Sequence, residues 1–211
     1  MIGRRAVLGG GISLIAGVPS GDRLEFRVLR KGSDIGSHMI QFSRSGDITE
    51  ARIDVSMTVT FGPFTLFRYR HTGTERTQGG RFVSLDTQTD NNGEPLKVSA
   101  RHDGGAVIVE ATGLARRTFP AETRPLTHWN RADMAAPLFN PQDGKPMPLT
   151  VTPRGQDMVP LANGSLVRAT HYALTGEAML DDWYSDDADI WTALRAIAKD
   201  GSIIDYRRVI P

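Results

Sequence analysis

IDVSMTVTF, residues 53–61, alternates apolar and polar side chains at every position. Successive side chains of a β-strand point to opposite faces, so the apolar groups of this stretch share one face. Other parts of the chain must cover that face to remove it from water. The stretch therefore predicts a half-buried strand of an antiparallel sheet.

The same pattern continues on both sides of this stretch. Residues 24–28 also alternate, and residues 33–36 are expected to turn the chain into a second strand at 38–43. Gly62-Pro63 ends the central strand. Further turn sequences rich in Gly, Asn and Asp follow at 78–80, 91–93 and 103–105. This spacing predicts an all-β fold, either a large curved antiparallel sheet or an open β-barrel-like meander, and disfavours parallel α/β folds.

Eight prolines lie between residues 119 and 160. Because proline has no N–H to donate, we expect this segment to form no continuous strand ladder. A short helix is predicted at 131–136, with Asn130 as its N-cap, and a brief strand at 149–152. The segment is expected to cover one open side of the sheet or to form a long crossover.

The last part of the chain fits two structures. Apolar residues from 190 to 197 fall at helical spacing and Gly201 follows them, which favours a helix. Asp200-Gly201 between extended runs is also typical of a two-residue hairpin turn. For residues 189–209 we choose the hairpin.

The N-terminus has the composition of an export signal. Arg4-Arg5 precede an uncharged, glycine-rich apolar run at 6–18, which is too short to span a bilayer as a helix. Adjacent arginines favour the twin-arginine route. We expect cleavage near Ser20, a single β-rich domain at 21–211, and a periplasmic or otherwise exported location.

Charge and cysteine content limit the partners. Removal of residues 1–20, which contain two arginines and no acid, changes the net charge from +1 to −1. A near-neutral domain lacks the basic surface that attracts phosphate backbones, so nucleic acid is not an expected partner. The absence of cysteine excludes disulfides and thiolate metal sites. We predict no transmembrane segment in the mature protein.

No motif in the chain indicates catalysis. The five histidines lie one by one along the sequence, and neither G-x-S-x-G nor H-E-x-x-H occurs. The acidic residues between 181 and 189 lack the central glycine and closing glutamate of an EF-hand loop. We therefore predict no catalytic residue, metal ligand or cofactor, while a composite site built from histidines and acids of separate strands stays open as an alternative.

Aromatic and polar side chains provide the candidate ligand-binding residues. Trp and Tyr bury a large surface and need a partner for their polar atom, so they line clefts as well as fill cores. Both roles, core plug and ligand wall, stay open for the tryptophans. The candidates are Tyr69, His71, His128, Trp129, Asn130, Trp183 and Tyr184.

Seven short segments carry a resemblance to a known family. They are FRVL at 26–29, IGSH at 35–38, FRYRH at 67–71, TQTDNNG at 87–93, HWN at 128–130, DWY at 182–184 and DGSIIDY at 200–206. In this order they resemble an uncharacterised family of exported proteobacterial proteins, a domain of unknown function. The resemblance implies an antiparallel β fold and an envelope location, and nothing about chemistry. More distantly, the chain is similar in fold to open-barrel envelope proteins of the lipoprotein-carrier type.

Together these observations predict a non-enzymatic periplasmic domain whose sheet and proline-rich cover bind a lipid, another apolar small molecule or an envelope protein. An enzyme with a composite His/acid site is the first alternative. A structural or interaction module without a pocket is the second.

Overall fold

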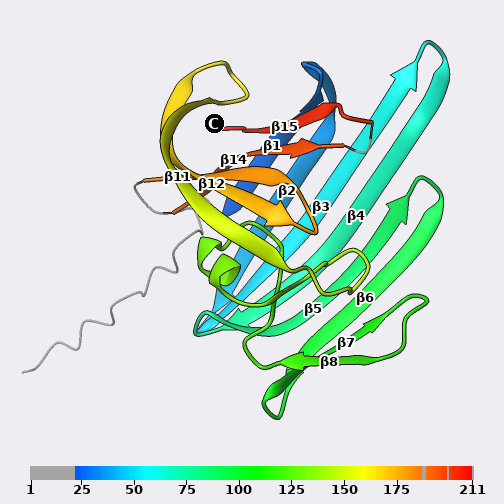
Figure 1. The fold of residues 1–211 in the computed structure, drawn as a ribbon, viewed down its shortest axis with the longest axis vertical. Helices are drawn as coiled ribbons and strands as arrows, with labels where there is room; N and C mark the ends of the chain where they lie inside the picture. The colour runs from blue at the N-terminus through cyan, green and yellow to red at the C-terminus, as the bar shows by residue number, and fades with distance from the viewer. Residues whose placement is uncertain (1–21, 187–188, 199, 211) are drawn as a thin grey trace, which may run out of the picture.

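A single thirteen-stranded antiparallel sheet forms most of the computed structural model (Figure 1), which describes residues 22–186, 189–198 and 200–210. The predicted all-β fold, an open β-barrel-like meander, is confirmed. The strands of this sheet are β1 Arg23–Arg30, β2 Ser33–Ser45, β3 Ile48–Phe61, β4 Phe64–Gln78, β5 Arg81–Asn91, β6 Glu94–Asp103, β7 Ala106–Ala111, β8 Arg117–Pro120, β11 Leu149–Pro160, β12 Leu166–Gly176, β13 Leu180–Ser185, β14 Trp191–Ile197 and β15 Ile203–Arg208.

Two meanders make up the sheet. Strands β1 to β8 pair in chain order, as do β11 to β15, and the pairing of β1 with β15 joins the two series. The edges of the sheet are β11 and β8, so the sheet curves without closing into a barrel. Its concave side is called the inner face below.

The inner face carries the main core. The alternation at 53–61 places Ile53 and Val55 on it, beside Phe26 and Ile40 from β1 and β2. Residues 121–148, called the cover, pack against these side chains. The cover contains β9 Arg124–Pro125, the 3₁₀ helix η1 Arg131–Ala135 and β10 Leu138–Phe139. A covering segment was therefore predicted in the correct region of the chain.

The first turn was predicted at the wrong place. The chain turns at Lys31-Gly32, where both residues have positive φ angles, +50° and +81°. Residues 33–36 belong to β2, and Gly36 lies at a bulge where β2 shifts register against β1. A Cβ on Gly36 would lie 1.9 Å from the Ser56 carbonyl oxygen, so glycine is needed there for close strand approach and not for a turn.

Proline does not prevent strand formation at 149–160. This segment pairs with β12 along its whole length, so the expected four-residue strand is wrong. The reason is position: β11 is an edge strand, and the register shifts between Pro153 and Gly155. Proline is tolerated at edge strands and bulges because its missing N–H is not needed there for a hydrogen bond to a neighbouring strand.

Two further predictions concern the ends of elements. The C-terminal hairpin is confirmed, but Ala198 N–H bonds to the Ser202 carbonyl, so the loop is one residue longer than predicted. Gly201, at φ +76°, takes the left-handed position that such loops require. Asn130 makes no side-chain cap to η1; instead its amide donates to Asp133.

The predicted signal segment at residues 1–20 lies outside the described residues. Within the part of the chain that the structure describes, no helix has the length and apolarity needed to cross a membrane.

Candidate functional site

Glu75 fastens the cover to the inner face. Thr127 Oγ1 and Trp129 Nε1, both from the cover, donate hydrogen bonds to Glu75 Oε2 at 2.8 and 2.7 Å. The Trp129 ring, 1% exposed, also packs edge-on against Phe42 with 5.3 Å between centroids. Trp129 therefore pins the cover to β2 and β4, which is the core-plug role.

Burial dominates the titration of Glu75. The side chain is 1% exposed, and desolvation raises the pKa of its carboxyl to about 8, with nearby Asp133 adding to the effect. The two hydrogen bonds act in the opposite direction and only partly compensate. Oε1 has no hydrogen-bond partner among the described residues. The carboxyl is therefore mostly protonated at neutral pH.

A second anchor joins the cover to the other meander. His128 Nδ1 donates to Asp182 Oδ2 at 2.8 Å, and Trp191 Nε1 donates to Oδ1 of the same carboxyl at 2.9 Å. Tyr184 donates its hydroxyl hydrogen to the His128 carbonyl at 2.6 Å. His128 has a φ of +67°, a left-handed conformation that is costly for a residue with a Cβ. The two hydrogen bonds to His128 hold it in that conformation, and the bond from Trp191 fixes Asp182.

Trp191 lies at the centre of an aromatic cluster on the inner face. Its ring stacks on His128 and meets His38 edge-on, with 5.2 Å between centroids in each case. Phe26 and Tyr206 also contact it, at 4.2 and 6.0 Å. Burial first, and then the charges of His128 and His71, lower the pKa of His38 to about 3. His38 is therefore neutral at physiological pH.

Tyr69 and His71 extend this cluster along β4. Their rings stack with 6.4 Å between centroids, and His71 Nδ1 lies 2.8 Å from Thr89 Oγ1 on β5. Burial lowers the pKa of His71 to about 4 and raises that of Tyr69 above its usual value. His38 and His71 both lie opposite Val55 of the strand between them, so they share the inner face, and His128 lies on the other side of Trp191 from the same cluster.

The structure does not bring Trp183 together with the other candidate residues. Trp183 lies on the outer face, where it stacks on His171 with 4.6 Å between centroids and donates to Asp157 Oδ2 at 2.9 Å. The other candidates, Tyr69, His71, His128, Trp129, Asn130 and Tyr184, belong to the inner face or the cover.

Sequence reasoning missed Glu75, Asp182 and Trp191 as members of this region. Strand periodicity was a usable signal for Asp182, because residues 182 and 184 share one face of a strand while 183 takes the other. Glu75 carried no such signal, since its partners lie more than fifty positions along the chain.

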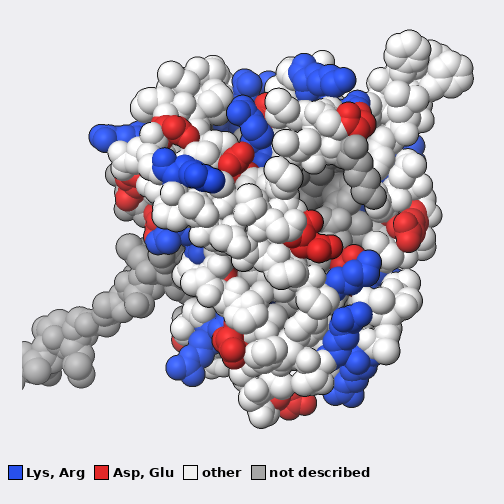
Figure 2. Space-filling model, in the orientation of Figure 1, with Lys and Arg blue, Asp and Glu red and all other residues white. Residues whose placement is uncertain are grey.

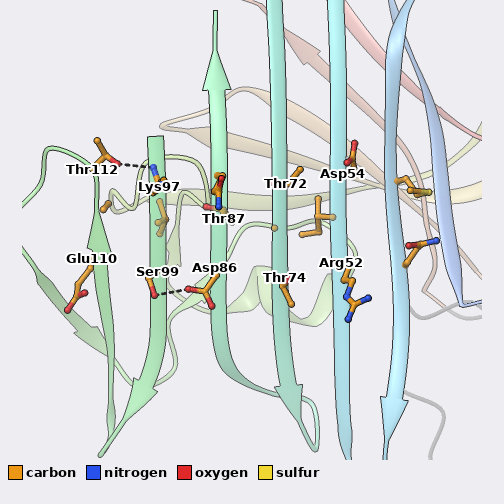
Figure 3. A pocket seen from close by; sticks show the side chains of 17 residues that line it. Arg52, Asp54, Thr72, Thr74, Asp86, Thr87, Lys97, Ser99, Glu110 and Thr112 are labelled. Carbon is orange, nitrogen blue, oxygen red and sulfur yellow. Dashed lines mark hydrogen bonds between the residues drawn. The ribbon is translucent and has the colours of Figure 1, made fainter. Parts of the chain in front are cut away.

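Two cavities lie away from the aromatic cluster. One, of about 770 Å³, is a shallow groove on the outer face of β2 to β7, walled by polar and charged side chains such as Arg52, Asp86 and Lys97 (Figure 3). The other, of about 830 Å³, lies between the β4–β5 turn and the start of the cover. Neither is lined by a predicted site residue.

The family model "Domain of unknown function (DUF6134)" matches residues 26–209, from β1 to the end of β15. The chain belongs to the DUF6134 family. A search of the curated proteins finds no match. Among solved structures, this DUF6134 chain is similar to the crystal structure of a beta-barrel-like protein of domain of unknown function DUF1849 from Brucella abortus, with 12% identity and a TM-score of 0.60. The alignment covers 89% of this chain and 95% of that one.

These comparisons establish a domain of unknown function with a β-barrel-like fold, as the sequence resemblance predicted. At 12% identity the likeness concerns the fold alone. Chemistry in the DUF6134 chain must therefore be argued from its own residues.

The acidic residues near the end of β13 are distributed among separate partners in the described structure. Asp181 contacts His171, Asp182 contacts His128, Asp186 contacts Arg168 and Asp189 contacts Arg131. Within the described ranges, no group of three or more His, Cys, Asp or Glu side chains is arranged to hold a metal ion.

Proposed function

We propose that this protein is an exported envelope domain that holds an apolar ligand against the part of the inner face that the cover leaves open. The observation that supports the proposal most directly is the partial burial of Met57, Tyr69 and Tyr206. These side chains continue the apolar core beyond the cover. An apolar molecule bound there would complete their removal from water.

The surroundings of these side chains are compatible with this location. Met57 lies opposite Tyr69 on the neighbouring strand, and Tyr206 lies on β15. Trp191 packs against Tyr206, and the His128–Asp182 pair lies directly beside it. A ligand would therefore meet an apolar wall with a few fixed polar atoms, which is the usual composition of a small-molecule site.

The exported location and the extent of the domain rest on the sequence. Arg4-Arg5 and the apolar run behind them support export with cleavage near Ser20, which leaves a domain at 21–211. N-terminal sequencing of protein recovered from the periplasmic fraction tests this point. A mature N-terminus near residue 21 is expected, and an intact Met1 in the cytoplasmic fraction would contradict it.

Native mass spectrometry of the same periplasmic material tests ligand binding. We expect an additional mass that organic solvent extracts from the protein. The dye 1-anilinonaphthalene-8-sulfonate, which fluoresces when it binds an apolar surface, provides a second measurement. Met57→Glu places a charge on the inner face and should abolish both the additional mass and the fluorescence of the added dye. Ser56→Glu, on the exposed opposite face of β3, is the matched control and should retain both. Wild-type protein with neither signal would contradict the proposal.

The His128–Asp182 pair favours acid–base catalysis as a second candidate function. Asp182 fixes Nδ1 of His128, and Nε2 forms no hydrogen bond with the described residues. A histidine oriented by a buried carboxylate is a common arrangement for a general base, and strained backbone is frequent at functional sites. A panel of chromogenic ester and glycoside substrates tests this candidate. Turnover abolished by His128→Asn would support it, and absence of turnover would leave ligand binding as the preferred function.

A further inference from the structure

The β3–β4 hairpin projects beyond its neighbours. The pairing of β2 with β3 begins at Gly36 and Met57, and that of β5 with β4 ends at Asn91 and Tyr69. Residues 58–67 therefore form a two-stranded ribbon with no third strand beside it, visible as the long projection at the upper right of Figure 1. This ribbon is called the finger below.

The end of the finger is apolar and exposed. Phe61 and Phe64 face each other across the Gly62-Pro63 turn and are 75% and 67% exposed, and Leu66 is 59% exposed. In Figure 2 the finger stands out from the rest of the surface without charged atoms at its end. It is unusual for a structured projection to expose two phenylalanines and a leucine to water. Exposed apolar groups of this kind mark sites that bind a protein or a membrane.

Charge is distributed unevenly around the finger. Residues 55–74 contain no Asp or Glu, although the chain has 24 acidic residues. The same stretch contains Arg68 and Arg70, both exposed. Arg70 Nη2 lies 3.5 Å from Asp54 Oδ2, whereas Arg68 forms no ion pair with the described residues. Arg70 also lies opposite Asp90 on β5, so acids on both neighbouring strands flank it. Arg68 is therefore the positive charge at the base of the finger, and the end of the finger is uncharged.

The spacing of these groups matches the depth of a bilayer surface. Arg68 follows Phe64 by four residues, about 13 Å along an extended strand. Apolar groups of proteins that lie on membranes enter roughly 5–10 Å into the boundary between headgroups and acyl chains. With Phe61 and Phe64 at that depth, the guanidinium of Arg68 would lie at the level of the lipid phosphates.

We propose that the end of the finger inserts into the surface of an anionic lipid bilayer, with Phe61, Phe64 and Leu66 among the acyl chains and Arg68 against the phosphates. The size of the finger favours a lipid over a protein partner. Three side chains of at most about 250 Å² each fall short of the roughly 800 Å² per partner that stable protein interfaces bury. This proposal does not depend on the ligand proposed for the inner face.

Co-sedimentation of the full chain with vesicles tests insertion. Vesicles of phosphatidylglycerol and phosphatidylcholine in equal amounts are compared with vesicles of phosphatidylcholine alone. We expect the double variant Phe61→Ser, Phe64→Ser to bind the mixed vesicles at least tenfold more weakly than wild type. Met158→Ser with Leu166→Ser removes similarly exposed apolar groups, 57% and 60%, from β11 and β12 at one edge of the sheet and should bind like wild type. Residues 1–21 are identical in all variants, so they contribute equally.

The charge variant tests the second part of the proposal. Arg68→Gln should weaken the preference for vesicles that contain phosphatidylglycerol, and added salt should weaken wild-type binding in the same way. Thermal unfolding of each variant verifies that it is folded.

Three results would overturn the inference. The first is that wild-type protein does not sediment with the mixed vesicles. The second is that a folded Phe61→Ser, Phe64→Ser variant binds these vesicles as wild type does. The third is that wild type binds no vesicles but is a dimer, which this variant converts to a monomer. The last result would assign the finger to self-association.

Discussion

At the scale of single residues, Glu75 shows how burial and hydrogen bonding compete. Its carboxyl receives two donors from the cover, yet desolvation still raises its pKa to about 8. The interior therefore contains a neutral carboxyl group that accepts hydrogen bonds from Trp129 and Thr127. The proton that the folded protein holds on this group must appear as a loss of stability as pH rises from about 4.5 to 8.

The pH dependence of unfolding tests this conclusion. The pKa of Glu75 is about 8 in the folded protein and ordinarily 4.5. Its stabilising contribution is therefore complete below about pH 4.5 and is lost as pH rises towards 8. From pH 6.5 to 8 we expect wild type to lose about 2 kcal/mol of unfolding free energy relative to Glu75→Gln. Urea unfolding measures the difference, with Glu50→Gln as a control that should parallel wild type. Parallel curves for wild type and Glu75→Gln would contradict the prediction.

His38 should act in the opposite direction. Its pKa falls from 6.5 to about 3 on folding, so its stabilising contribution is present above pH 6.5 and is lost as pH falls below that value. Between pH 7 and 5, wild type should lose about 2 kcal/mol more unfolding free energy than His38→Phe. His102→Phe, at an exposed position, is the control and should follow wild type. Equal losses for His38→Phe and wild type would refute this assignment.

At the scale of elements, strand periodicity predicted the strands well, whereas glycine did not distinguish a turn from a bulge. Alternation at 53–61 predicted β3 because one face of that strand is buried and the other is wet. Gly36 suggested a turn, because a positive φ is needed in turns and in bulges alike. Lys31, the first of the two residues that turn the chain, gave no sequence signal since lysine rarely adopts a positive φ.

Two glycine substitutions separate these roles. Gly36→Ala would place a Cβ 1.9 Å from the Ser56 carbonyl, so we expect it to cost more than about 3 kcal/mol of stability. Gly32→Ala meets nothing within 4 Å and should cost only about 1 kcal/mol, the price of its left-handed backbone. Chemical unfolding compares the two variants. A similar cost for both would mean that strain, and not strand contact, explains Gly36.

At the scale of the whole molecule, the candidate site shows where sequence reasoning ends. The aromatic segments at 69–71 and 128–130 were identified, and the fold places both around the inner face. Their partners Glu75, Asp182 and Trp191 come from strands distant in sequence, so only the tertiary fold reveals the pairs. Long-range contacts of this kind leave no local pattern in the chain.

The pairing of β1 with β15 has a consequence for synthesis. Phe26 lies opposite Arg208, so the first described strand finds its second neighbour only after nearly all of the chain has left the ribosome. Until then both meanders expose unpaired edges, which are templates for aggregation. High contact order also slows folding. A nascent chain of this protein is therefore expected to depend on chaperones that shield its strand edges for most of its translation.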